Sequence, residues 1–342
     1  MPATDFFCLP TMIGSLPHHD AKAACALVKR FLKYIPAWPQ LPRRSPLENM
    51  STQYSEGFPG VAIENHNLRV KYPPEFDKDL ERLYAAYLAG DYHQYPVNSE
   101  YAAGLYSFLE TRFLSPLAVK GQVTGPITWG LTVTDDDRRA IIYDDVLGDA
   151  LPKFLKLKVA WQEAKLREIC PRTIMFIDEP YLASFGSLAG PFSREKVISL
   201  LNEVLEGASG LKGIHCCGNT DWPMLLATSI DILSFDAYNF ASSLNLYPVE
   251  VKRFLDKGGA IAWGIVPTGE EDLAKESVAS LKDRLEEAMA PFTRKGISFN
   301  KLKRQALLTP SCGLASLSSE ASAEEALLKL IRLSEEMRKR GL

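Results

Sequence analysis

The sequence predicts an α/β protein built as a single closed (β/α)8 TIM barrel, with a small insertion between its second and third strands. Three observations predict this fold: apolar runs of strand length alternate with longer amphipathic segments, the strand-like runs number eight, and several of them end in polar residues. The carboxyl ends of barrel strands meet on one face, where active sites lie. We therefore expect one domain, residues 1–342, with its site at that face.

The expected strands are short apolar runs, and the expected helices have apolar residues at intervals of three and four. The strands cover residues 6–14, 34–41, 117–125, 173–180, 211–218, 231–238, 260–267 and 306–313. The helices cover residues 20–34, 151–169, 193–207, 250–258, 277–290 and 322–340.

One segment, residues 61–111, interrupts this alternation between the second and third expected strands. Its first part predicts a small hairpin, and the rest predicts helices over the barrel mouth. An open, doubly wound sheet is the structural alternative to a barrel. No glycine-rich dinucleotide fingerprint follows the first strand to support that alternative.

Composition excludes several classes of function. Hydrophobic residues make up 46% of the chain and charged residues 24%, as in ordinary globular proteins. The net charge of -3 offers no basic surface for nucleic acid. No stretch approaches the roughly 18 apolar residues of a membrane span, and the N-terminus does not resemble a signal peptide. We expect a cytoplasmic protein whose six cysteines are thiols.

The segment GIHCCGNTDW, residues 213–222, places a histidine and two cysteines at the end of the fifth expected strand. Because side chains alternate along a strand, His215 and Cys217 face one way and Cys216 faces the other. Cys312 reaches the same face from the last strand, and Asp236 could supply an oxygen. The simpler interpretation is a buried strand with small polarisable residues. The other is a mixed nitrogen and sulfur site for Zn²⁺, with three protein ligands and one exchangeable position.

Five motifs, TMIGSLP, VTGPITW, FIDEP, HCCGN and TPSCGL, occur in the order found in the catalytic barrel of cobalamin-independent methionine synthases. The resemblance extends over about residues 11–313. It also includes the related methylcorrinoid:coenzyme M methyltransferases and, more distantly, uroporphyrinogen decarboxylase. It implies a TIM barrel that transfers a methyl group to a thiol with the help of Zn²⁺, and homocysteine, giving methionine, is the first expectation.

The resemblance also implies roles for individual residues. His215, Cys217 and Cys312 match the family's zinc ligands, and Asp236 falls where the family has a ligating glutamate. This aspartate is expected to bind the metal and to take part in catalysis, coming on and off the metal as substrate binds.

The remaining matches concern substrate. Ser15 matches the serine that holds the amino acid's carboxylate, and Asp178, expected to be catalytic, matches the aspartate that binds its ammonium group. Gln53 falls where methionine synthase has a glutamate for the same ammonium. Trp129, in the GPITWG turn, is expected to line the donor side.

Two departures from the family concern the methyl donor. The family's two-barrel enzymes are about twice as long, and their proton-donating histidine is absent from the segment WGIVPTGEED. Both departures favour a methylated corrinoid over a folate as donor, either free methylcobalamin or a corrinoid on a partner protein.

Three other functions stay open. A coenzyme M methyltransferase is the nearest, although Asp178 would repel a sulfonate. A decarboxylase of the uroporphyrinogen type would use Arg43 and Arg44 but needs a larger arginine cluster. The third is a non-catalytic module that binds a thiol or a corrinoid protein.

Overall fold

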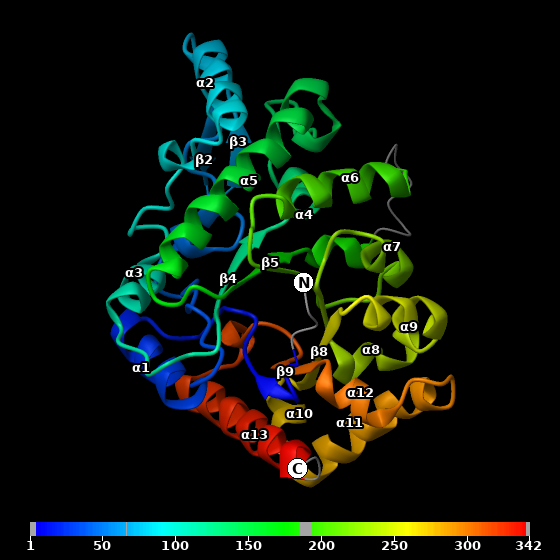
Figure 1. Cartoon of the computed structure of the whole chain (residues 1–342). Coiled ribbons are helices and arrows are strands. Elements are labelled where there is room, and N and C mark those ends of the chain that lie inside the picture. Colours follow the sequence, from blue (N-terminus) through cyan, green and yellow to red (C-terminus); the bar gives the residue numbers. More distant parts are fainter. Residues whose placement is uncertain (1–4, 66, 185–192, 340–342) are drawn as a thin grey trace.

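The computed structural model describes residues 5–65, 67–184 and 193–339 of the chain. Its centre is a curled sheet of seven parallel strands with helices on its outer side (Figure 1). Across the sheet, the strands are β1 (Leu9–Pro10), β9 (Ala306–Pro310), β8 (Ala260–Val266), β7 (Ile232–Phe235), β6 (Leu211–Cys216), β5 (Thr173–Asp178) and β4 (Val119–Thr124). Each lies within one of the expected runs.

The expected second strand, residues 34–41, is not a strand, and here the structure departs from a closed eight-stranded barrel. Among the described residues, the sheet ends at β1 on one side and at β4 on the other. Two isolated bridges join the segment to its neighbours, Gln40 to Ser15 and Ala37 to Lys120. Pro36 and Pro39 have no backbone N–H, so the segment cannot form a continuous ladder. The sheet is therefore an open, barrel-like curl.

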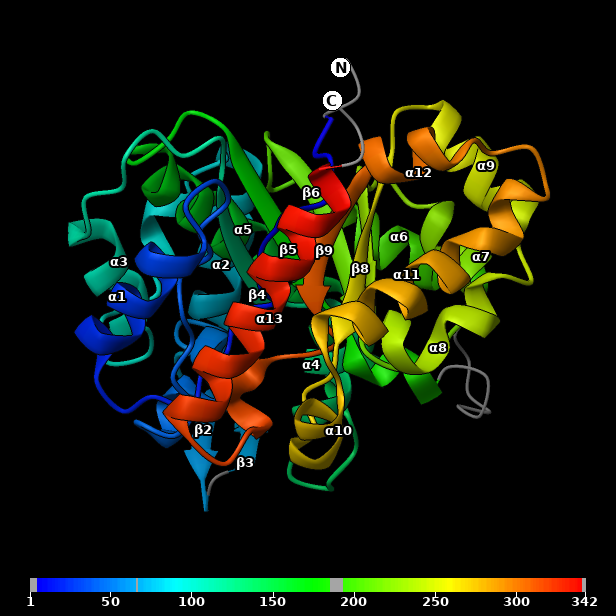
Figure 2. The ribbon, with the colours of Figure 1, turned by 90° about the horizontal axis from the view of Figure 1, so that it is seen from below.

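The long helices are those that periodicity predicts, and they pack around the outside of the sheet (Figure 2). They are α1 (Ala21–Phe31), α5 (Asp145–Arg167), α6 (Arg194–Leu205), α9 (Pro248–Asp256), α11 (Val278–Thr293) and α13 (Glu320–Lys339). Position 340, where the last helix was expected to end, lies outside the described residues. The start of α1 agrees with the expected start, because a side chain caps the helix there. Asp20 accepts a hydrogen bond from the backbone N–H of Ala23 at 2.7 Å.

Shorter helices follow strands or fill the loops, and the sequence patterns did not predict them individually. They are α4 (Pro126–Thr132), α7 (Trp222–Leu226), α8 (Ala237–Leu244), α10 (Glu270–Lys275) and α12 (Phe299–Arg304). None of the described helices is long and apolar enough to cross a membrane.

The insertion begins with the predicted hairpin, in which β2 (Val61–Glu64) pairs antiparallel with β3 (Asn67–Val70). Two helices follow, α2 (Phe76–Ala89) and α3 (Ala103–Glu110). They were expected over the barrel mouth, and this is wrong: α2 packs against α5 and α3 against α1. Only the hairpin projects at the end of the molecule where α10 lies (Figure 2).

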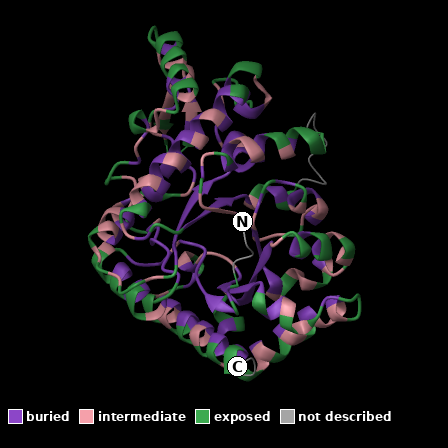
Figure 3. Ribbon diagram, in the orientation of Figure 1, coloured by how far each residue is buried: buried purple, intermediate pink, exposed green. Residues whose placement is uncertain are grey.

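The two faces of the sheet bury different side chains, and buried residues fill the centre of the molecule (Figure 3). On β5, Ile174 and Phe176 belong to the apolar cluster inside the curl, whereas Met175 and Ile177 belong to the larger cluster under the helices. This alternation has the period of two that strands impose. Asp178 ends β5 and continues its inner face.

The same alternation brings polar side chains into the curl from other strands. His215 on β6 lies between Ile214 and Cys216, which both pack in the outer cluster. On β7, Ile232 belongs to the inner cluster, and Ser234, two positions later, shares its face. The inner face is thus apolar toward the strand starts and polar toward the strand ends.

Candidate metal and substrate site

A cavity of about 430 Å³ opens at the carboxyl ends of the strands. Its walls come from segments far apart in the sequence: Ser15 after β1, Asp178 on β5, His215 on β6, Thr268 after β8 and Cys312 after β9. This is the face on which the polar strand ends were predicted to meet. The site is built here because parallel strands bring their carboxyl ends to the same edge.

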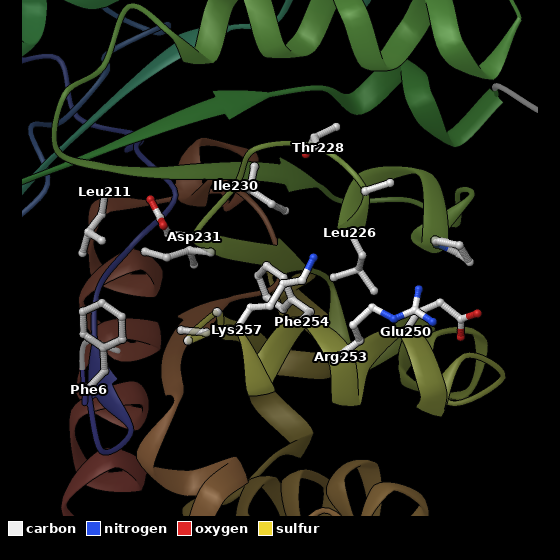
Figure 4. Close-up of a pocket in the computed structure, with 16 residues that line it drawn as sticks. Phe6, Leu211, Leu226, Thr228, Ile230, Asp231, Glu250, Arg253, Phe254 and Lys257 are labelled. Carbon is white, nitrogen blue, oxygen red and sulfur yellow. The ribbon is translucent and has the colours of Figure 1, made fainter. Parts of the chain in front are cut away.

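A second cavity, of about 400 Å³, lies at the opposite end of the strands (Figure 4). Leu211, at the start of β6, and Ala260, at the start of β8, are in its wall, with Arg253 and Lys257 from the α9 region. No cysteine or histidine of the described chain lines it. Of these two cavities, only the one at the carboxyl ends is lined by described histidine and cysteine residues.

His215, Cys217 and Cys312 form a compact group in the carboxyl-end cavity. One candidate ligand atom from each lies within 4.8 Å of the other two. His215 is buried, while Cys217 and Cys312 are half-buried and line the cavity. Cys216 points away and packs in the outer apolar cluster. The ends of β6 and β9, with β7 and β8 between them in the sheet, thus bring one nitrogen and two sulfurs together.

The two thiols of this group are coupled. A hydrogen bond from the Cys312 thiol lowers the pKa of Cys217; burial opposes that shift, and the His215 ring adds to it. The same hydrogen bond, together with burial, raises the pKa of Cys312. The contact between the two sulfurs thus favours a negative charge on the pair at Cys217.

The group fits a Zn²⁺ ion on two counts. The Nε2 atom of His215 is buried and has no hydrogen-bond partner among the described residues, which is costly unless something else satisfies it. One imidazole nitrogen and two thiolate sulfurs are ligands that Zn²⁺ accepts, and three protein ligands are typical of sites that also bind substrate.

Asp178 presents an unpaired carboxylate oxygen at the cavity. The residue is 8% exposed and lines the cavity, and its Oδ1 atom is buried without a partner among the described residues. Burial raises the pKa of Asp178, and the charge of Lys120 opposes this shift. A buried carboxylate with a free oxygen is suited to a cationic group of a ligand.

Lys120 supplies the opposing charge from inside the curl. It is fully buried on β4, and its Nζ atom donates to the carbonyl of Ile13 at 2.6 Å and to Oε1 of Gln122 at 3.1 Å. The ammonium also lies 4.4 Å from the centre of the Phe176 ring. Burial lowers the pKa of Lys120 to about 8, and Asp178 opposes this shift. The two residues are therefore partners in charge without a direct ion pair.

Ser15 lies at the cavity wall, against the loop that carries Cys312. Its carbonyl accepts a hydrogen bond from the N–H of Leu314 at 2.9 Å. A Cβ atom added at Gly313 would lie 2.1 Å from Oγ of Ser15. Glycine at position 313 therefore leaves room for the Ser15 hydroxyl as it lies in this structure.

Asp236 is not part of the three-residue group in this structure, and its binding to the metal stays a prediction. It caps the start of α8: Oδ1 accepts from the backbone N–H of Asn239 at 2.9 Å, and Oδ2 accepts from the Asn239 amide at 2.7 Å. An aspartate directly before a helix commonly satisfies free N–H groups in this way. Both oxygens are therefore engaged within the protein.

Gln53 and Trp129 do not line the cavity either. Gln53 is fully buried and accepts a 2.7 Å hydrogen bond from Gln40, which is the glutamine that reaches the cavity. Trp129 is also fully buried; its Nε1 donates to the carbonyl of Ser51, and its ring packs edge-on against Phe58. In this structure neither residue is placed to touch a ligand in the cavity, and their contacts with substrate and donor stay predictions.

Glu48 is a cavity residue that sequence reasoning missed. It is buried, and its Oε1 accepts from Arg44 at 2.6 Å, whereas its Oε2 is buried without a partner among the described residues. The sequence signal that could have found it is the spacing of four residues between Arg44 and Glu48, which suits an ion pair. Arg43 turns to the carbonyls of Leu317 and Ser318. The two arginines therefore do not form a cluster for substrate carboxylates.

Comparison with known proteins shows a shared fold. The B12-independent methionine synthase from Shewanella sp. W3-18-1, in complex with selenomethionine, matches 97% of this chain and 98% of its own, with a TM-score of 0.62 and 16% identity. The putative vitamin-B12-independent methionine synthase from Listeria monocytogenes matches 92% of this chain and 85% of its own, with a TM-score of 0.55 and 15% identity.

A methyltransferase from Methanosarcina mazei matches 92% of this chain and 83% of its own, with a TM-score of 0.54 and 16% identity. No protein-family model matches the sequence, and no curated protein matches it. At these identities the likeness shows the fold, which is the fold of the enzymes that the sequence motifs resemble.

Proposed function

We propose that this chain, as one domain, is a zinc-dependent methyltransferase that methylates the thiol of homocysteine to give methionine, with a methylated corrinoid as donor. One observation carries the proposal: His215, Cys217 and Cys312 share a cavity with Asp178, whose Oδ1 atom is buried without a partner among the described residues. A metal site for a thiol beside an acidic group suits a substrate that carries both a thiol and an ammonium group.

His215, Cys217 and Cys312 would hold the metal. A bound Zn²⁺ ion supplies the positive charge that makes a thiol ionise at neutral pH, so that its sulfur becomes a nucleophile. Cys217 and Cys312 contribute two negative charges to the site. They keep its net charge low, so the attacking sulfur retains its electron density.

Asp178 and Ser15 would orient the substrate. The free oxygen of Asp178 accepts hydrogen bonds from the ammonium group, and the Ser15 hydroxyl reaches the carboxylate. Glu48 also lines the cavity, but Arg44 pairs with it. The acidic group of Asp178 disfavours coenzyme M, which carries a sulfonate and no amine. This contrast supports homocysteine over coenzyme M.

The donor is inferred from what the site lacks. The segment WGIVPTGEED, residues 263–272, contains no histidine that could protonate a folate leaving group. The cobalt–carbon bond of a methylated corrinoid needs no proton donor. Its electron pair stays on the cobalt as the sulfur–methyl bond forms. The donor is either free methylcobalamin or a corrinoid carried by a partner protein.

A matrix of donors and acceptors tests the proposal. Purified protein, with its zinc content measured, is given methylcobalamin or methyltetrahydrofolate together with homocysteine or coenzyme M. We expect about one zinc per chain and methionine formed from homocysteine and methylcobalamin. Equal activity in zinc-free protein would contradict the metal assignment. Zinc-bound protein that methylates neither thiol would instead favour a non-catalytic binding module.

Substitution of one ligand tests the site itself. Cys217→Ser removes a soft ligand, so we expect both zinc and methyl transfer to be lost. Cys216→Ala is the matched control, because this neighbouring cysteine packs in the outer cluster. It should retain zinc and activity. Loss of zinc in the control alone would show that the wrong cysteine had been assigned.

A further inference from the structure

Ser234 contacts one of the two ring nitrogens of His215. The two residues are in register on neighbouring strands, β7 and β6. The Nδ1 atom of His215 lies 3.0 Å from Oγ of Ser234, and the serine is fully buried. This hydroxyl is the partner of Nδ1, and its position is set by the pairing of β6 with β7.

The other ring nitrogen is free. Nε2 of His215 is buried and has no partner among the described residues, although the residue belongs to the group whose ligand atoms lie within 4.8 Å of one another. A neutral imidazole has one N–H and one lone pair, and the partner of one nitrogen decides which tautomer is present. With Nδ1 engaged by Ser234, Nε2 is the atom left for a metal ion.

We propose that Ser234 is a positioning residue that accepts a hydrogen bond from Nδ1–H of His215, so that His215 offers the lone pair of Nε2 to the metal. The inference rests on the proposed metal site and adds to it the ligating atom and the residue that orients it.

The chemistry of a hydroxyl suits this position. Histidine ligands usually donate their second N–H to a carboxylate, a carbonyl or a water, which fixes the ring. A carboxylate would add a negative charge to a site that already has two thiolates. A neutral serine orients the ring without that charge. The carboxylate of Asp236, which directly follows β7, accepts hydrogen bonds from Asn239 instead.

The affinity of the full chain for Zn²⁺ is the first test. Removing the hydroxyl leaves Nδ1–H buried without an acceptor, so we expect Ser234→Ala to bind zinc about 10- to 100-fold more weakly than wild type. Competition with a chromophoric chelator measures this. Ser234→Thr keeps a hydroxyl and should restore most of the affinity, whereas the similarly shaped Ser234→Val should not.

Thr309→Val is the matched control. Thr309 is also fully buried, follows Leu307 on the inner face of β9, and has an Oγ1 atom without a partner among the described residues. Its substitution removes a buried hydroxyl that does not contact His215. We expect zinc affinity to be unchanged in this variant, which separates the loss of one specific contact from the general effect of altering the interior.

Histidine nitrogen chemical shifts in the zinc-loaded wild type give a test that needs no variant. We expect one of the five histidines to show a protonated Nδ1 and a metal-bound Nε2. Metal bound through Nδ1, or equal zinc affinity in wild type and Ser234→Ala, would overturn the role of Ser234 alone. A wild type that binds no zinc would overturn the proposed function as well.

Discussion

Lys120 and Asp178 illustrate how single residues set the electrostatics of the cavity. Both are buried, and burial favours the neutral form of each: it lowers the pKa of Lys120 and raises the pKa of Asp178. The charge of the partner opposes the shift in both cases. The Nζ atom of Lys120 is held by the neutral acceptors Ile13 and Gln122. Its charge therefore remains available to stabilise an ionised Asp178 at a distance.

Removing the charge of Lys120 should weaken substrate binding. Burial already places the pKa of Asp178 above its usual range, and without Lys120 it should rise further. Because the ammonium of homocysteine needs an ionised Asp178, the acid limb of kcat/KM in Lys120→Met should move to higher pH, with KM affected more than kcat. A shift of one pH unit means about a tenfold loss of binding on the acid side.

Lys158→Met is the control for this prediction. Lys158 is likewise fully buried, but it lies on α5 and donates to the carbonyl of Pro96 at 2.6 Å. Its removal should change stability and leave the pH profile in place. Identical pH profiles for wild type and Lys120→Met would show that Lys120 does not act on Asp178.

At the scale of elements, the junctions between strands and helices decide what a polar strand end does. β5 ends at Asp178, and Asp236 directly follows β7, so both strands carry an aspartate on the inner face. Asp178 nevertheless faces the cavity, whereas Asp236 caps α8. The two junctions differ in the element that comes next along the chain. After β7, the helix begins at once and its free N–H groups need an acceptor. After β5, Glu179 accepts from the N–H groups of Ile127 and Thr128 instead.

This difference predicts how Asp236 responds to substitution. Asp236→Asn keeps a capping side chain, so we expect zinc binding and stability close to those of wild type. Asp236→Ala removes the cap and should lower the free energy of unfolding by about 1 kcal/mol. Chemical denaturation and zinc analysis measure the two effects. Loss of zinc in the Asn variant would restore Asp236 to the metal ligands.

The long helices and the sheet strands were predictable from sequence, and the short helices were not. Three or more turns give α5 or α13 a clear apolar stripe. A helix as short as α7 or α10 has too few residues to show one. The missing strand at residues 34–41 has another cause, because its apolar residues suggested a strand while its prolines prevent a ladder.

At the scale of the whole molecule, residues 34–41 occupy the opening between β1 and β4. Their backbone reaches β4 through two hydrogen bonds, from Trp38 to Lys120 and from Lys120 to Pro36. The side chains of the segment pack in the interior, where Ile35, Ala37 and Trp38 are inaccessible to solvent. Further backbone hydrogen bonds join Tyr34 to Leu117 and Ala118, and Gln40 to Gly14 and Leu16. Within the described segment, however, only the N–H groups of Trp38 and Gln40 donate to backbone carbonyls.

Hydrogen exchange should reveal this weakness. We expect the amides of residues 34–41 to exchange faster than those of β5 and β6, which have hydrogen-bonded strands on both sides. Exchange followed by mass spectrometry of peptides from the intact protein measures the difference. Equal protection of the two regions would mean that the curl behaves as a closed barrel in solution.

Local sequence was sufficient for most properties that depend on backbone periodicity, the segment at residues 34–41 being the exception. It placed the sheet strands and long helices, and it put His215 and Cys217 on one face with Cys216 on the other, because side-chain direction alternates in any strand. The sequence also predicted that Cys312 reaches this face. Only the tertiary structure could show how close the three side chains come, that Ser234 contacts the histidine, and that Gln40 rather than Gln53 lines the cavity. Such contacts depend on strand order, register and loop paths, which join residues that no short stretch of sequence contains together.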